Sequence, residues 1–502
     1  MKALFIFLFF TLYLMSSTLH LATSSNPSRL NPILATDSAS SEISGYIFNT
    51  LVKYDKDAKK IIGDLAKSFY FENNTTLIFK LRKDVTWHDG VKFSAKDVLF
   101  TYETLLSPKV ISPYSSSFRF IKKLEIIDNY TLKVIYKQPY FKSLETWMIG
   151  IIPYHILKDE KDLMNSSFNT DPIGTGPYKL SQLQYSKNII LQAYDKYFEG
   201  KAKIDKISFH VISDSVTRFL MLKMGSLDIG TVDPIAYERK LDKNFFNRFN
   251  VYEKISRSYT YLGFNLRRNK FKNPKVREAL SLAIDRKELI DILFFKHAKI
   301  CTGPFLPNTL AFNKKIKAPI QNIQKAKKLL EEAGYNSSNP FKFEITTSNS
   351  NPIRPYAIQI LQHQLKKVGV IVTLRVMEWQ AFLNMVVFPH NFDAVLLGWG
   401  LSLTPDPYMF WHSDNDKQGG FNLVGYHNPK IDKMIETSQT IIDRKKLSKI
   451  WQKMFQIIVK DNPYLFLYIP NSITTVNKRI KNIEPTQNGI WYNYIHWEKE
   501  KN

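Results

Sequence analysis

The chain has 502 residues, of which 44% are hydrophobic and 23% charged, and its formal net charge is +25. This composition is typical of a folded multidomain protein and excludes a disordered, collagen-like or coiled-coil chain. Because the lysines are scattered along the sequence, we interpret the positive charge as a solvated basic surface and do not expect nucleic acid as a partner.

The first seventeen residues have the pattern of an export signal. Lys2 precedes an uncharged apolar run over residues 3–15, which Ser16 and Ser17 follow. The run is too short to span a bilayer comfortably, so we predict a signal peptide over 1–17 that is cleaved near Ser16 or Ser17. The alternative is an uncleaved anchor.

Cysteine usage agrees with export of a protein without a lipid anchor. Cys301 is the only cysteine, so no internal disulfide can form and no cysteine follows the signal to carry a lipid. A large exported domain folds without disulfides because its core is big enough. We therefore expect a periplasmic protein of a two-membrane bacterium.

The next segments predict two strand-rich regions. Residues 18–22 read as a first strand, and 76–83 and 131–137 alternate as strands do. Residues 94–106 read as a helix, because Ser94 is a good N-cap and Asp97 stands where a capping box has its acid.

His88 and Asp89, beside Trp87, raise the question of a catalytic pair. Asp89 and Gly90 form a strong turn signal between strand and helix, and Trp87 looks exposed. The His–Asp bond of a triad usually joins distant parts of a chain. We therefore interpret this stretch as a structural turn.

The second half predicts helices and a parallel sheet. Residues 271–294 read as one helix, capped by Asn273 with Pro274 in its first turn, and 322–335 as another that ends at Gly334. A strand-helix-strand-helix-strand order follows, over residues 341–347, 355–369, 370–377, 379–387 and 392–399. This order predicts a parallel sheet covered on both faces, with ligands at the carboxyl ends of its strands, where loops 347–356 and 398–408 emerge.

Motifs for catalysis and metal binding are weak. The chain has no G-x-S-x-G and no H-E-x-x-H, and "GTGPYK" (174–179) lacks the third glycine of a dinucleotide fingerprint, so it reads as a turn. "WHSDND" (411–416) has metal-ligand types, but a solvated polar loop is the favoured interpretation. We predict no catalytic residue, no metal site and no cofactor.

Six long blocks together resemble the family 5 solute-binding proteins of bacterial ABC importers, the oligopeptide- and dipeptide-binding type. They follow in family order over nearly the whole mature chain: 30–55, 65–103 (which contains "TWHDGVKFSAKDV"), 171–180, 261–290, 326–335 and 393–413 ("DAVLLGWGLSLTPDPYMFWHS"). The resemblance implies an α/β fold: a two-lobed periplasmic-binding-protein clamp, type II-like with an extra domain, whose mixed sheets are flanked by helices. It implies a discontinuous lobe I over 18–45, 170–258 and 470–502, an extra domain II over 46–169, and a lobe III over 259–469.

The resemblance also implies a binder rather than an enzyme. Such a protein captures oligopeptides or dipeptides between its lobes and delivers them to an inner-membrane ABC permease, and we expect it to be a monomer. Two alternatives stay open: a binder of the same fold for a nickel complex, haem or sugar, and an exported hydrolase.

Five residues are predicted to line the cleft. Trp399 ends the apolar strand and Tyr356 lies on the neighbouring loop, where flat aromatic faces contact a ligand. In dipeptide-type members an Asp after the "GW" strand pairs with the ligand's amino group, but Ser402 stands there in this chain. Asp406 lies nearby in a proline-bounded turn where we expect solvent exposure. Arg354 has the planar fork that suits a ligand carboxylate.

Overall fold

The computed structural model describes residues 17–500 except 59, 113, 418–419 and 487–488. All of the predicted export signal but Ser17 lies outside this part. Within the described residues, every helix falls short of the length and hydrophobicity that a membrane span needs.

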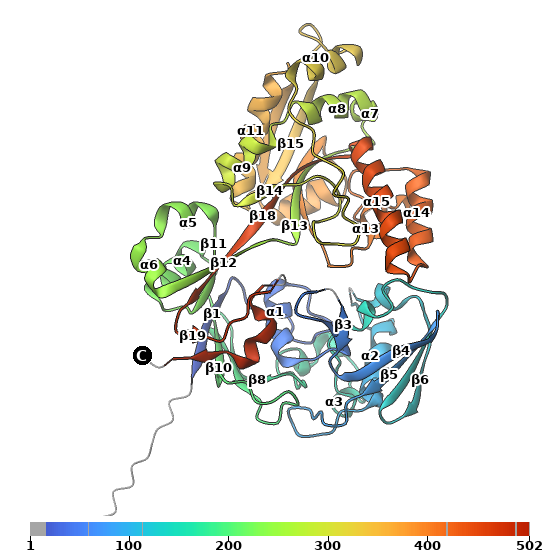
Figure 1. Ribbon diagram of the computed structural model, residues 1–502, viewed down its shortest axis with the longest axis vertical. Coiled ribbons are helices and arrows are strands. Elements are labelled where there is room, and N and C mark those ends of the chain that lie inside the picture. Colours follow the sequence, from blue (N-terminus) through green and yellow to red (C-terminus); the bar gives the residue numbers. More distant parts are fainter. Residues whose placement is uncertain (1–16, 59, 113, 418–419, 487–488, 501–502) are drawn as a thin grey trace, which may run out of the picture.

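The described chain forms two bodies joined by one long strand, β18 (Tyr464–Asn477), and by a second crossing of the chain beside it (Figure 1). We call residues 258–468 the upper body and the remaining described residues the lower body. Each body contains its own sheet or sheets flanked by helices, which agrees with the predicted two-lobed α/β architecture.

The lower body contains a four-stranded sheet in the order β1-β10-β9-β8 and a second one in the order β4-β5-β7-β6. Strand β1 pairs with β10 in parallel, whereas the other pairs in both sheets are antiparallel. Its elements are β1 (Thr18–Thr23), α1 (Ser38–Ile47), β2 (Val52–Tyr54), β3 (Ile61–Gly63), β4 (Ala66–Asn73), β5 (Thr76–Leu81), α2 (Ala95–Leu106), β6 (Ile121–Asp128), β7 (Thr131–Tyr136), α3 (Tyr154–Leu157), β8 (Tyr178–Gln184), β9 (Asn188–Ala193), β10 (Lys206–Val211), α4 (Ser215–Met224), β11 (Ile229–Val232), α5 (Pro234–Lys240), α6 (Lys243–Arg248), β12 (Phe249–Ile255), β19 (Ile480–Lys481) and β20 (Glu498–Lys499).

The upper body is built on the sheet β18-β13-β17-β15-β16. The predicted parallel core is confirmed, since β15 pairs in parallel with both β16 and β17, but β13 and β18 add antiparallel strands and make the sheet mixed. Its elements are β13 (Ser258–Phe264), α7 (Asn269–Lys272), α8 (Pro274–Leu282), α9 (Arg286–Phe294), β14 (Ala298–Ile300), α10 (Ile323–Glu332), β15 (Lys342–Ser348), α11 (Ile353–Lys366), β16 (Ile371–Met377), α12 (Trp379–Phe382), β17 (Ala394–Gly400), α13 (Pro407–Trp411), α14 (Pro429–Gln439), α15 (Arg444–Asp461) and β18 (Tyr464–Asn477).

Strand β18 joins the bodies and has different neighbours along its two edges. β12 and β13 follow one another along one edge, because Ile255 pairs with Asn471 and Thr260 with Tyr468. β11 and β14 pair with the other edge. The chain therefore crosses between the bodies twice at neighbouring positions, a geometry that permits hinge motion.

Local signals set several of these elements as the sequence predicts. Ser94 caps α2 and Asp97 closes the capping box, so both predicted bonds form. Asn273 caps α8 with Pro274 in its first turn. The single helix predicted over 271–294 is wrong, however, because the chain leaves the helix after Leu282 and Asp285 caps a new helix, α9.

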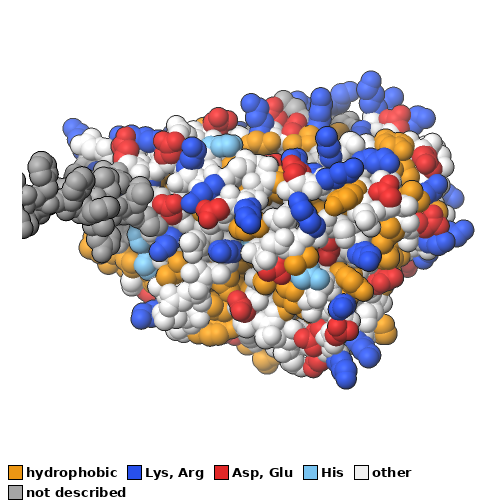
Figure 2. All heavy atoms as spheres, turned by 90° about the horizontal axis from the view of Figure 1, so that it is seen from below, with side chains coloured by type: hydrophobic (Ala, Val, Ile, Leu, Met, Phe, Trp, Pro, Cys, Tyr) orange, Lys and Arg blue, Asp and Glu red, His pale blue; other side chains and the backbone are white. Residues whose placement is uncertain are grey.

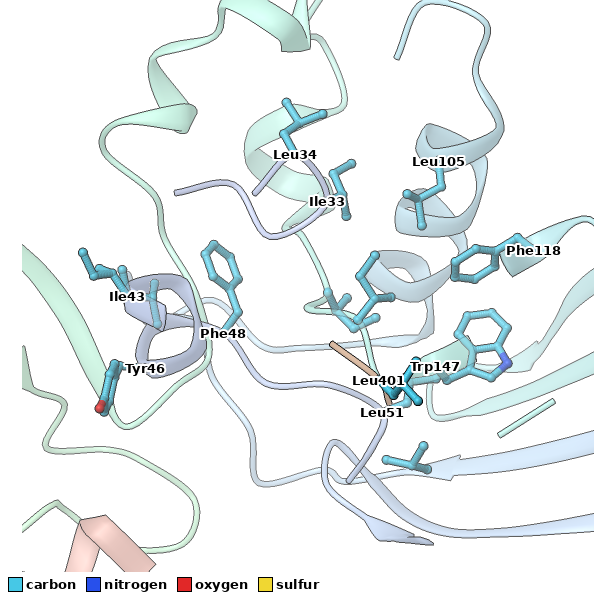
Figure 3. Close-up of a cluster of buried hydrophobic side chains, with 14 of the residues drawn as sticks. Ile33, Leu34, Ile43, Tyr46, Phe48, Leu51, Leu105, Phe118, Trp147 and Leu401 are labelled. Carbon is cyan, nitrogen blue, oxygen red and sulfur yellow. The ribbon is translucent and has the colours of Figure 1, made fainter. Parts of the chain in front are cut away.

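A continuous buried core runs through the lower body and into the upper body. Figure 3 shows part of it, with Leu51 and Trp147 of the lower body and Leu401 of the upper body among the labelled side chains. Helices α8, α9 and α11 cover the opposite face of the upper sheet over a second cluster. Viewed from below, Lys and Arg side chains are interspersed with Asp and Glu (Figure 2), as a solvated basic surface predicts.

Candidate functional site

The His88–Asp89 pair is not a catalytic pair in the structure. The His88 ring accepts a bond from the Gly174 amide at Nδ1 (3.2 Å) and contacts the Gly176 carbonyl through Nε2 (3.0 Å). Burial lowers the pKa of His88 to about 4. Asp89 instead bonds to His155, with Oδ2 2.7 Å from Nε2. The stretch around His88 therefore packs against the "GTGPYK" loop and has a structural role.

Trp87 was expected to be exposed, and that expectation is wrong. Its side chain is fully buried and packs edge-on against Phe93 at 6.3 Å. An aromatic residue beside a polar turn looks exposed in sequence, but the turn folds over the ring. The Trp87 ring thus anchors the turn to the core.

The predicted site begins at the carboxyl end of β17. Strand β17 ends beside the crossing segment, where Ser258 pairs with Gly400 and the Leu401 amide donates to the Arg257 carbonyl (2.7 Å). The loop after β17 is thus bonded to the segment that links the two bodies.

Arg354 lies beside this strand on the face that α11 covers. A Cβ built on Gly398 would lie 3.2 Å from Nη2 of Arg354, so the missing side chain makes room for the guanidinium. The Arg354 Nε atom is buried without a hydrogen-bond partner, and its guanidinium makes no ion pair with any described residue. Burial lowers the pKa of Arg354 from its ordinary value. A cation held without a partner is costly unless a ligand supplies the counter-charge.

Trp399 lies on the other face of β17, because side chains alternate along a strand. Its ring stacks on Tyr261 at 6.1 Å and contacts Phe410 at 4.7 Å and Phe421 at 5.5 Å. Its Nε1 atom donates to the Tyr464 hydroxyl at 3.4 Å. The ring is half-buried, so part of it stays accessible at the edge of this aromatic cluster.

Ser402 and Asp406 occupy different parts of the following loop. Ser402 is exposed, and its hydroxyl donates to the Thr404 carbonyl at 2.6 Å. Asp406 caps α13, where it accepts from the Tyr408 amide at 3.1 Å. The carboxylate is half-buried, not fully exposed, and it contributes to the raised pKa of Tyr140 in the lower body, where burial is the main cause.

Tyr356 is separated from the other predicted residues. It is two positions from Arg354 on α11, so the two side chains point in different directions around the helix. Tyr356 is 58% exposed and lines a cavity of about 730 Å³ between α5 and α9. Because α5 follows β11 and α9 precedes β14, this cavity lies on the β11–β14 edge of β18.

Two neighbouring cavities lie on the β12–β13 edge. The smaller, about 300 Å³, is lined by Arg257, Ser402 and residues 306–309. The larger, about 950 Å³, lies between the two bodies and shares Ala58, Asn308, Thr309 and Leu403 with the smaller one. Together they have the size of a binding site for a small ligand or short peptide.

Polar contacts between the bodies lie along the wall of the larger cavity. Glu145 of the lower body accepts bonds from Arg444 at 2.7 Å and from the Thr404 hydroxyl at 2.9 Å. The Tyr54 hydroxyl lies 3.2 Å from that of Thr404. Tyr54, Thr404 and Arg444 all line the cavity, so this contact forms part of its wall.

The sequence interpretation missed the lining supplied by the loop between β14 and α10. This loop and the β2–β3 hairpin provide many of the cavity residues. Residues 301–322 form no helix or strand, and irregular stretches of this length are usually functional. The absence of periodicity was the only signal available.

Trp411 ends α13, and the rest of the "WHSDND" stretch forms a short turn after it. His412 is buried, stacks on Tyr408 at 4.5 Å and accepts from the Asp414 amide. Across the part of the chain that the structure describes, no three His, Cys, Asp or Glu side chains are placed to hold a metal ion.

Known proteins resemble this chain over almost its full length. The family model described as bacterial extracellular solute-binding proteins, family 5 Middle, matches residues 60–422. The oligopeptide-binding protein AppA of Bacillus subtilis is 31% identical over 491 residues, which cover 94% of this chain and 89% of AppA.

Solved structures agree. AppA in complex with a nonapeptide has a TM-score of 0.82 at 30% identity and covers 96% of this chain and 99% of its own. NikZ of Campylobacter jejuni in complex with Ni(L-His) has a TM-score of 0.83 at 28% identity, with coverage of 96% and 99%. DppA of Helicobacter pylori in complex with the peptide STSA has a TM-score of 0.80 at 27% identity, with coverage of 96% and 98%.

Proposed function

Because this chain belongs to the family 5 bacterial extracellular solute-binding proteins, we propose that it captures peptides between its two bodies and delivers them to an ABC permease of the inner membrane. It works in the periplasm as a monomer without a lipid anchor, and it performs no chemistry on its ligand. The peptide-bound relatives support the ligand class.

One observation carries this proposal beyond family membership. The loop that contains Ser402 lines a cavity and is also bonded to the crossing segment at Arg257. A ligand held there contacts the linker about which the bodies turn, so its binding energy favours one clamp position.

The predicted domain boundaries become part of the proposal. Lobe I comprises 18–45, 170–258 and 470–502, domain II comprises 46–169, and lobe III comprises 259–469. The boundaries at 258 and 470 fall where the chain crosses between the bodies, which supports them.

We assign Arg354, Trp399 and Ser402 to a ligand site around the carboxyl end of β17, where Arg354 and Trp399 lie on opposite faces of the strand and Ser402 lines the smaller cavity. Arg354 receives a carboxylate, Trp399 offers part of an aromatic face, and Ser402 replaces an acid that would pair with an amino terminus. Asp406 and Tyr356 stay candidate ligand residues, although Asp406 caps α13 and Tyr356 lines a different cavity.

The decisive experiment identifies the ligand. Mass spectrometry of material that co-purifies with the mature protein is expected to find peptides bound in stoichiometric amount, with no cleavage products after incubation. If the bound material were a nickel complex, haem or sugar, the protein would be a binder of a non-peptide ligand. Turnover of a peptide would support a hydrolase.

Tryptophan fluorescence tests the position of the site. Peptide binding is expected to change the emission of the wild-type protein and to change it less in Trp399→Phe. An unchanged response in Trp399→Phe would remove Trp399 from the site.

A further inference from the structure

The larger cavity between the bodies has an unbalanced charge. Its charged lining residues are Lys60, Lys314, Lys315 and Arg444, and none of its lining residues is acidic. Arg444 is neutralised by Glu145, which lies behind the wall. The three lysines make no ion pair with any residue that the structure describes.

The three lysines come from both bodies. Lys60 stands just before β3 in the lower body, whereas Lys314 and Lys315 belong to the long loop of the upper body. When the bodies approach each other, like charges converge on one cavity, and their repulsion opposes closure. A ligand with negative charge in this cavity removes the repulsion and is therefore bound more tightly by the closed form than by the open one.

The larger cavity adjoins the proposed ligand site. It shares Asn308, Thr309 and Leu403 with the smaller cavity, which Ser402 lines. A chain of several residues that starts beside Ser402 therefore extends toward the lysines. A small neutral ligand would leave them without counter-charge.

We propose that this cavity is a subsite for acidic side chains, so that the protein selects peptides rich in Asp and Glu. This inference rests on the proposed function, since it names the class of peptide that the same site takes. Lys60, Lys314 and Lys315 are exposed like many other lysines, but these three line one cavity between the two bodies.

The test compares two synthetic probes of equal length, Ala-Ala-Ala-Glu-Glu and Ala-Ala-Ala-Gln-Gln, by calorimetry at low ionic strength. The glutamate peptide is expected to bind at least about tenfold more tightly, and the difference is expected to shrink as salt rises. In a Lys60→Gln, Lys314→Gln, Lys315→Gln variant the two peptides should bind equally.

A matched variant controls for net charge. Lys122→Gln, Lys327→Gln and Lys367→Gln remove the same charge from exposed lysines outside the cavity, and this variant should keep the full preference. The acidic subsite would be overturned if both peptides bound the wild type equally, or if both variants lost the preference for the glutamate peptide to the same extent. Neither result would contradict the proposed function. If neither probe binds and no peptide co-purifies with the protein, the proposed function itself fails and the inference falls with it.

Discussion

The surroundings of Arg354 indicate a ligand-binding residue more clearly than those of the other predicted site residues. Its guanidinium packs against the glycine backbone of β17 and lacks a protein partner among the described residues. Folding gains nothing from desolvating a cation in this way, so its placement makes sense as part of a binding site.

Replacing Arg354 should therefore separate binding from stability. Arg354→Gln is expected to weaken the binding of peptides with a free carboxyl terminus by about 1.5–3 kcal/mol, the usual contribution of a charge-assisted hydrogen bond. Peptides with an amidated terminus should be unaffected. Calorimetry with both peptide forms measures this, with the exposed Arg375→Gln as control.

The same variant should unfold at an equal or higher temperature without ligand, because a desolvated cation is removed. A large fall in unfolding temperature would instead show that Arg354 stabilises the fold. Equal losses for free and amidated peptides would contradict its role as a carboxylate anchor.

Because Ser402 stands where an acid would pair with the ligand's amino group, we expect the protein to bind peptides with little dependence on a free amino terminus. A serine forms no ion pair, so N-acetylated and free peptides of one sequence should bind within about tenfold, roughly 1.4 kcal/mol. Ser402→Asp is expected to introduce a preference for the free form of about 0.2–1 kcal/mol, because the position is exposed.

Calorimetry on this pair of peptides tests both statements. If acetylation of the peptide causes a far larger loss in the wild-type protein, a carboxylate such as Asp406 anchors the amino group instead.

At the scale of elements, one cap divides what the sequence pattern reads as a single helix. The apolar stripe continues from α8 into α9, but the Asp285 side chain accepts bonds from the amides of Lys287 (2.9 Å) and Glu288 (3.0 Å). These bonds start α9 in a new direction.

Asp285→Ala should therefore destabilise the upper body by about 0.5–2 kcal/mol. Asp285→Asn, which keeps an accepting oxygen, is the matched control and should cost less. Chemical denaturation of the three proteins measures the difference. An alanine variant as stable as the wild type would mean that packing alone holds the break between the helices.

At the scale of the whole molecule, His297 joins the two bodies in a way that depends on pH. It belongs to the upper body and lies 2.8 Å from both Glu253 and Glu238 of the lower body. Burial works against the charged ring, but the two carboxylates outweigh it and raise the pKa of His297 above 6.5.

This contact should stabilise the folded protein most at low pH. Its contribution is fully present below pH 6.5, the ordinary pKa of histidine, and is lost as the pH rises through the raised folded value. Thermal unfolding of the wild type between pH 6 and 9 should show this loss, and His297→Gln should not. Parallel profiles for the two proteins would exclude the contact as a source of pH dependence.

Sequence alone determined the features that depend on neighbours along the chain. The Ser94 capping box, the Asn273–Pro274 helix start and the strands and helices from β15 to β17 follow from local hydrogen bonding and periodicity. The family blocks are equally local, because each is a run of residues in order. These features identified the fold and the family.

Only the tertiary structure decided which distant side chains meet. It buried Trp87, divided the helix at Asp285 and turned Tyr356 away from Arg354. It also brought Lys60 and Lys314 to one cavity, although they come from different bodies. Periodicity records which face of an element is buried, but not which other element covers it, and a loop such as 301–322 has no periodicity at all. The position of each functional group therefore depended on packing between segments far apart in the chain.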